Sequence, residues 1–197
     1  MGKKPRQRKK KVWSWGLVPW PESDPDWIIG IDPSIEYLGM TLLAVKGKDL
    51  IYKDHVSGTF TGKDEDRLYE IETFVRFNVG QLVVTHNTEN LLAVIEKPSF
   101  VNTKIMKDPT DIIRLGFAYG RITGALDDII EQYNWFIHWS GVWASLWTNW
   151  RSEKLRRAQA NMIFNFTFPN PHTADAALLA YTYFEQYKVR KMAEKAP

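Results

Sequence analysis

The sequence predicts an α/β fold in which a mixed sheet, with three antiparallel strands followed by parallel ones, is flanked by helices. Three observations predict it. Strand-like segments with short links open the domain, helical and apolar segments then alternate, and no segment repeats. With 197 residues, 44% of them hydrophobic, the chain is long enough for one well-packed domain and too short for two ordinary ones.

The first half of the domain contains four predicted strands and one helix. Residues 27–32 (WIIGID) form a short apolar run that ends in an acid, and residues 37–45 and 49–58 have strand-like composition. Their short links predict an antiparallel meander. Apolar residues then keep a helical period over 64–80, which predicts an amphipathic helix. The apolar run 91–96 (LLAVIE) suits a strand buried on both faces.

The second half alternates again between helix and strand. Residues 109–131 predict a helix with Pro109 in its first turn, and Gly116, Gly120 and Gly124 recur along one face, where they allow close packing against a sheet or a partner helix. Residues 135–139 predict a strand and 152–165 a basic helix. A loop with two prolines precedes the last predicted helix, 173–192.

The first 26 residues differ in composition from the rest of the chain, the 27–197 domain. They hold four of the ten prolines and three tryptophans, which predicts a disordered arm with a Trp-Pro part that docks on the domain. Seven cations lie within residues 3–11 (KKPRQRKKK), and the remaining 19 basic and 23 acidic residues leave the rest of the chain at net −4. Such a cluster favours sequence-independent binding to nucleic acid, although a nuclear-localisation signal or a solvated tail has the same composition.

Composition also excludes several classes. No apolar run reaches the ~18 residues of a membrane span, and the N-terminus lacks the apolar region of a secretory signal. The absence of cysteine excludes disulfides and thiolate metal sites. We therefore expect an intracellular protein located with DNA, in the cytoplasm of a prokaryote or phage-infected cell, or in the nucleus if the basic tail is a localisation signal.

Three acids stand at the predicted ends of strands or helices. Asp32 ends the first strand, Glu96 ends the fourth, and Asp175 lies near the start of the last helix. Ligands at neighbouring strand ends converge at one edge of a sheet, and oxygen ligands select Mg²⁺ or Mn²⁺. Two such ions can cleave a phosphodiester. Each acid alone is also explained as a turn, strand-end or helix-dipole residue.

His172 precedes Asp175 by three residues, so the two side chains can face the same side of a helix start. It is a candidate nitrogen ligand or general base.

Four segments together resemble RuvC-type Holliday-junction resolvases. IIGIDPSIEYLG resembles the first acidic motif of that family and VIEKPSF the second, while LGFAYGRITGAL and HTADAALLAYTY resemble two later helices. The match runs in order from about residue 27 to 183. Ser34 replaces a glycine of the family pattern, and His172 replaces the first aspartate of the closing pair.

The resemblance implies an RNase H-like fold, a homodimer, and paired symmetric nicks in a four-way DNA junction. It implies Mg²⁺ or Mn²⁺, two ions per active site, held by Asp32, Glu96, His172 and Asp175. Phe100 would stack into the junction, and Lys154 would contact the phosphate near the cut. Other cations are candidates for the DNA path or ordinary solvated residues, namely Lys97, Lys104, Lys107, Arg151, Arg156 and Arg157.

Several alternatives remain. A flap-, fork- or RNA-cutting nuclease of the same fold would carry the same acids, and a catalytically inactive DNA-binding protein is favoured if His172 disrupts the site. An actin-like ATPase would need a second glycine-rich phosphate loop, which the sequence lacks. Trp139, Trp143, Trp147 and Trp150 are spaced 4, 4 and 3, the period of one helix face, and predict an aromatic stripe packed in the core more than a stacking surface.

Overall fold

The computed structural model describes residues 24–88, 90–97, 109–133, 136–143 and 152–194, with backbone alone for Pro109, for 131–133, for β5 and for residues 190 and 194. The elements follow in the order β1 (Trp27–Pro33), β2 (Tyr37–Lys46), β3 (Asp49–Thr59), α1 (Asp64–His86), β4 (Asn90–Lys97), α2 (Pro109–Tyr133), β5 (Phe136–Trp143), α4 (Glu153–Phe164) and α5 (Pro171–Glu194). The predicted order of strands and helices is confirmed.

The sheet has five strands in the order β3-β2-β1-β4-β5. β1 pairs antiparallel with β2, and β2 with β3, whereas β1–β4 and β4–β5 are parallel. This is the predicted mixed sheet, with an antiparallel meander followed by parallel strands. The central strand β1 therefore lies between a strand of each kind, and its C-terminal end adjoins that of β4.

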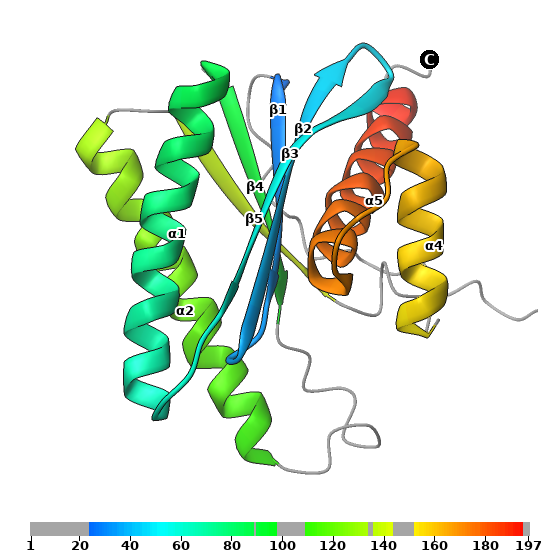
Figure 1. Ribbon diagram of the computed structural model, residues 1–197. Coiled ribbons are helices and arrows are strands. Elements are labelled where there is room, and N and C mark those ends of the chain that lie inside the picture. Colours follow the sequence, from blue (N-terminus) through cyan, green and yellow to red (C-terminus); the bar gives the residue numbers. More distant parts are fainter. Residues whose placement is uncertain (1–23, 89, 98–108, 134–135, 144–151, 195–197) are drawn as a thin grey trace, which may run out of the picture.

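Helices cover both faces of the sheet, α1 and α2 on one side and α4 and α5 on the other (Figure 1). The strand period of two divides the side chains between two cores. Ile29, Ile31 and Ile95 pack toward α1 and α2, while Ile28 and Val94 pack toward α5. By this alternation Asp32 and Glu96 are directed to the α5 face, where the third predicted acid lies.

Two helix boundaries differ from the prediction. α1 continues past residue 80 to His86 and stops at Asn87, whose positive φ of 49° closes the helix in the left-handed conformation. α5 begins at Pro171 instead of residue 173, so Asp175 lies just past its first turn. Asn170 caps this helix, because its Oδ1 accepts a hydrogen bond from the backbone N–H of Thr173 at 2.9 Å.

The helical spacing of the four tryptophans does not correspond to a helix at its first two positions. Trp139 and Trp143 lie on β5, which extends to Trp143. A spacing of four residues places two side chains on one face of a helix, but four is also an even number, so it places them on one face of a strand. Trp147 and Trp150 lie outside the described residues, as do residues 1–23 of the predicted arm.

In the described part of the chain, α1, α2, α4 and α5 all begin at the same end of the sheet, where β1 and β4 end (Figure 1). Glu36, in the turn after β1, pairs with Arg67 of α1, and Asp64 at the start of α1 pairs with Arg114 near the start of α2. Glu153 and Pro171, the first residues of α4 and α5, line one cleft with Asp32. The positive ends of the helix dipoles therefore surround this edge.

Candidate active site

Asp32 and Glu96 lie side by side on the two central parallel strands. Ile31 of β1 is in register with Ile95 of β4, so the next residues of the two strands are the acids. Asp32 is buried and Glu96 is partly buried. The negative charge of one carboxylate disfavours ionisation of the other when two such groups lie close together.

Two glycines bring the backbone of α5 directly onto the sheet beside these acids. A Cβ on Gly39 of β2 would lie 2.3 Å from the carbonyl carbon of His172, and a Cβ on Gly30 of β1 would lie 1.9 Å from the carbonyl oxygen of Ala176. The hydroxyl of Thr41 donates a 2.7 Å hydrogen bond to the carbonyl of Thr173. Only residues without a side chain permit this approach, which carries His172 and Asp175 to the end of β1.

His172 contacts the first acid and is held by an aromatic ring. Its Nδ1 lies 3.0 Å from Oδ2 of Asp32. The ring of Tyr37 stacks on the imidazole with centroids 5.1 Å apart and planes 9° from parallel. Stacking on one face and a hydrogen bond at the edge fix the orientation of the imidazole.

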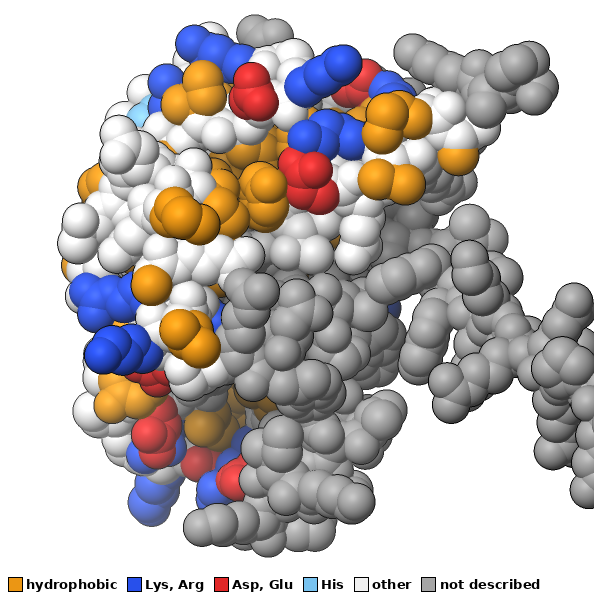
Figure 2. Space-filling model, turned by 90° about the vertical axis from the view of Figure 1, so that its right-hand side faces the viewer, with side chains coloured by type: hydrophobic (Ala, Val, Ile, Leu, Met, Phe, Trp, Pro, Cys, Tyr) orange, Lys and Arg blue, Asp and Glu red, His pale blue; other side chains and the backbone are white. Residues whose placement is uncertain are grey.

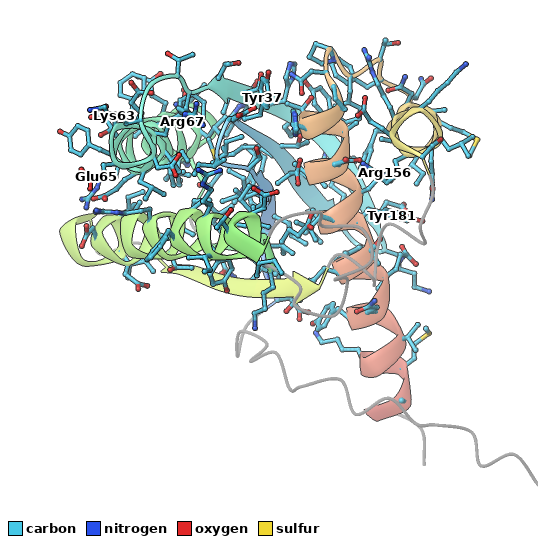
Figure 3. All side chains as sticks on the ribbon, turned by 90° about the horizontal axis from the view of Figure 1, so that it is seen from below. Tyr37, Lys63, Glu65, Arg67, Arg156 and Tyr181 are labelled. Carbon is cyan, nitrogen blue, oxygen red and sulfur yellow. The ribbon has the colours of Figure 1, made fainter. Side chains whose placement is uncertain are left out.

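Arg156 of α4 binds the third acid in bidentate geometry. Its Nε lies 2.9 Å from Oδ1 of Asp175, and its Nη2 lies 2.6 Å from Oδ2. Both side chains are largely shielded, with 20% of Arg156 and 8% of Asp175 exposed. Seen along the sheet from this end, Arg156 lies between α4 and α5, and Tyr37 lies between α1 and α5 (Figure 3).

The surroundings of the cleft raise the pKa values of Glu96, His172 and Asp175. Burial, followed by the charge of Asp32, raises the pKa of Glu96 well above its usual value. The hydrogen bond to Asp32 raises the pKa of His172. Burial raises the pKa of Asp175, although Arg156 opposes the shift. Groups with pKa values displaced by burial and by one another are typical of catalytic sites.

The donor set fits hard divalent cations in its chemistry. Asp32, Glu96 and Asp175 offer carboxylate oxygens, and His172 offers a nitrogen, a combination that suits Mg²⁺ or Mn²⁺. Within the described ranges, however, no three His, Asp or Glu side chains already converge as a cation site. Asp175 directs both oxygens at Arg156, and Asp32 directs one at His172. Binding of a cation would therefore require these contacts to rearrange.

The structure brings the four predicted active-site residues into one cleft. Its walls are formed by Asp32, Pro33, Ser34, Glu96, Glu153, Arg156, Pro171, His172 and Asp175, and its volume is about 250 Å³. At ~30 Å³ for each water molecule, that volume accommodates several waters or a phosphate group with its cations.

The residues predicted to contact DNA lie in different surroundings in the structure. Lys154 is exposed on α4, one residue after the cleft residue Glu153, and Lys97 is partly buried at the end of β4. Arg156 is inside the cleft and not on an outer surface. Phe100 and Lys104 lie outside the described residues.

Arg157 takes no part in the cleft. Its guanidinium donates hydrogen bonds to the carbonyls of Phe168 and Pro169 and so anchors the segment that leads into α5.

Sequence reasoning missed three features of this site. In the sequence, Tyr37 stands out only as part of the motif IIGIDPSIEYLG, and nothing marks Glu153. Arg156 is a candidate for the DNA path, whereas in the structure it contacts Asp175. The basic helix 152–165 identifies Arg156 as one of several cations, but its contact with a buried acid depends on how this helix packs beside α5.

Comparisons with solved structures show similarity to junction resolvases. RuvC of Thermus thermophilus in complex with a Holliday-junction substrate matches with a TM-score of 0.62 and 16% identity, over 82% of this chain and 96% of that chain. The yeast mitochondrial Holliday-junction resolvase matches with a TM-score of 0.53 and 13% identity, over 83% of this chain and 80% of that chain. No family model and no curated protein matches the sequence.

These similarities establish the fold. The chain has the RNase H-like fold of RuvC, with the mixed sheet flanked by helices, and the predicted resemblance to RuvC-type resolvases is confirmed at that level. At such identities the activity does not follow from the fold, so it has to be argued from the cleft itself.

Proposed function

We propose that this protein is a metal-dependent endonuclease that resolves four-way DNA junctions by paired, symmetric nicks. The observation that carries the proposal is the convergence of Asp32, Glu96, His172 and Asp175 in one cleft at the end of the parallel strands. The solved structures of the same fold include a resolvase bound to a Holliday junction. An α/β active site is expected at this edge of a sheet.

Each residue has a distinct part in the proposed chemistry. Asp32, Glu96 and Asp175 would hold two divalent cations, which supply an activated water and stabilise the leaving 3′ oxygen. His172 would serve as a nitrogen ligand or accept the proton of the attacking water, and its stacking on Tyr37 would keep the ring in place. Pro33 and Ser34 form a wall of the cleft next to Asp32.

The surroundings of the cleft support a polyanionic substrate. Four helices begin at this edge, and backbone N–H groups at helix starts together with the positive dipole end favour phosphate. Lys154 is exposed on the first turn of α4 and is the best-placed cation for a phosphate beside the cleft. On the face covered by α4 and α5, basic side chains are interspersed with acidic and apolar ones, so charge on that face alone does not indicate a DNA path (Figure 2).

The decisive experiment compares cleavage of different nucleic-acid substrates by the full chain. Labelled four-way, three-way, flap, fork and linear DNA and a structured RNA are incubated with the full chain, with and without Mg²⁺ or Mn²⁺. We expect cation-dependent paired nicks in the four-way junction. Preferential cutting of flaps, forks or RNA would favour another nuclease of this fold, and binding without cutting would favour an inactive DNA-binding protein.

Substitution of the acids tests the site within the same assay. Asp32→Asn, Glu96→Gln and Asp175→Asn should each abolish cleavage and leave junction binding intact, because the carboxylate oxygens are needed for the cations and not for the DNA. Asp49→Asn, at an exposed position at the start of β3, is the matched control and should cut as the wild type does. Near-normal turnover by any of the three variants would remove that residue from the site.

A further inference from the structure

Arg156 occupies the position in which a cation would meet the third acid. Its guanidinium donates hydrogen bonds to both oxygens of Asp175, at 2.9 and 2.6 Å, and Arg156 lines the same cleft as Asp32 and Glu96. The positive charge therefore lies in the cleft that holds all three carboxyl groups. No other lysine or arginine borders the cleft within the described part of the chain.

This contact opposes the binding of a divalent cation to Asp175. Both carboxylate oxygens already accept hydrogen bonds from Arg156, so an ion that binds either oxygen would lie close to the positive charge of the guanidinium. Bidentate arginine–carboxylate pairs are among the stronger polar contacts in proteins. Arginine cannot lose its proton, so its positive charge stays in the cleft unless the side chain moves.

We propose that Arg156 is an internal counterion that competes with the divalent cation for Asp175. The inference rests on the proposed function, because it takes Asp175 to be a cation ligand. Arg156 shields Asp32 and Asp175 from mutual repulsion and is displaced when a divalent ion takes its place. The displaced guanidinium stays tethered to α4 at the rim of the cleft, where a phosphate of the substrate would lie.

Cation affinity measures this competition directly. Mn²⁺ binding to the full chain is measured by calorimetry, without DNA, for the wild type, Arg156→Gln and Arg156→Lys. Arg156→Gln should bind Mn²⁺ roughly tenfold more tightly, equivalent to about 1.4 kcal/mol. Arg156→Lys keeps the charge but loses the bidentate contact, so its affinity should lie between the other two. Arg121→Gln removes an equal charge from the opposite helical layer, where Arg121 pairs with Glu72, and should bind as the wild type does.

Thermal unfolding provides a second readout that a purely structural salt bridge would not reproduce. In a chelator Arg156→Gln should unfold at a lower temperature than the wild type, because Asp175 loses its counterion. Saturating Mn²⁺ should remove most of that difference. Equal or weaker Mn²⁺ affinity in both Arg156 variants would overturn the inference. Tighter binding by Arg156→Gln with Arg156→Lys unchanged would support the counterion role, because the charge alone would then account for the competition.

The outcomes separate this inference from the nuclease proposal. If the affinities shift as expected and the wild type cuts no DNA or RNA substrate, the counterion role stands and the proposed function fails. If the wild type cuts junctions with Mn²⁺ and the affinities do not shift, the counterion role alone fails. If none of the proteins binds Mn²⁺, Asp175 is not a cation ligand and both are wrong.

Discussion

His172 is the residue that most distinguishes this cleft from the family pattern. It lies between an acid and an aromatic ring, with Asp32 at its edge and Tyr37 on its face. The contact with Asp32 favours the imidazolium form and raises the pKa of His172. The protonated ring can neither bind a metal nor accept a proton, so the same contact that positions the imidazole also makes it sensitive to pH.

The pH dependence of cleavage should therefore depend on His172. At a fixed, sub-saturating Mg²⁺ concentration, single-turnover cleavage by the wild type should fall as the pH drops from about 9 to about 5.5, with the loss beginning above the ordinary imidazole pKa of ~6.5. His172→Asp should cut and lose less activity on the acid side. His172→Ala should lose most of its rate, and His55→Ala, a histidine of β3 that hydrogen-bonds Tyr52, should keep the wild-type profile.

The contact between His172 and Asp32 should give the stability of the fold a pH dependence opposite to that of cleavage. A raised histidine pKa stabilises the fold below the unfolded value of ~6.5, and this contribution disappears as the pH rises through the folded value. In a chelator, His172→Ala should therefore cost more in unfolding temperature at acid than at alkaline pH. Superimposable pH profiles of wild type and variants, in both cleavage and unfolding, would place His172 outside the site.

At the scale of elements, the position of α5 depends on two strand glycines. Gly30 and Gly39 lie on neighbouring strands, under the backbone of Ala176 and His172 respectively. Because α5 carries both His172 and Asp175, the distance between helix and sheet sets the distance between these residues and Asp32. Position 39 thus requires glycine because α5 packs against it beneath the active site, and not because the backbone there has an unusual conformation.

A methyl group at position 39 should disturb activity more than stability. In Gly39→Ala the Cβ would meet the backbone of His172, at 2.3 Å from its carbonyl carbon, so the start of α5 has to move. Overpacking typically costs ~1–3 kcal/mol, and we expect cleavage to fall at least tenfold in a protein that remains folded at 25 °C. Gly80→Ala on α1 meets no atom within 4 Å and should be neutral or slightly stabilising. Wild-type cleavage and unfolding temperature for Gly39→Ala would contradict this account of the packing.

Strands and helices differ in how well their sequences predicted the site. The strand-end acids were predictable, because the apolar runs of β1 and β4 identify strands and the acids end both runs. The partner of Asp175 was not, because the contact of Arg156 depends on how α4 packs beside α5, which no local pattern encodes. The tryptophan spacing is ambiguous for a different reason, since a spacing of four fits both periods. The segment 135–139 predicts a strand, and β5 extends that strand to Trp143.

At the scale of the whole molecule, the two helical layers have different surroundings. α4 and α5 border the cleft, whereas α1 and α2 cover the opposite face of the sheet (Figure 1). The outward face of α2 carries Ile113 and Phe117, 56% and 60% exposed. Gly116, Gly120 and Gly124 share this face, and a Cβ on any of them meets no atom within 4 Å.

In the described part of the chain, no helix is both long and apolar enough to cross a membrane.

We infer that this face of α2 is where two subunits meet, as paired symmetric nicks require. Gly120→Leu should prevent close approach of a second helix and weaken the dimer by roughly ten- to a hundredfold, the equivalent of ~1–3 kcal/mol of overpacking. The subunit itself should be no less stable, because a Cβ at position 120 meets no atom within 4 Å and Leu favours a helix over Gly. Light scattering over a range of concentrations measures the effect, with Gly80→Leu on α1 as the control. A Gly120→Leu protein that dimerises like the wild type would place the interface elsewhere. A wild type that is monomeric at micromolar concentration would leave each subunit to nick one strand alone, against the symmetric mechanism.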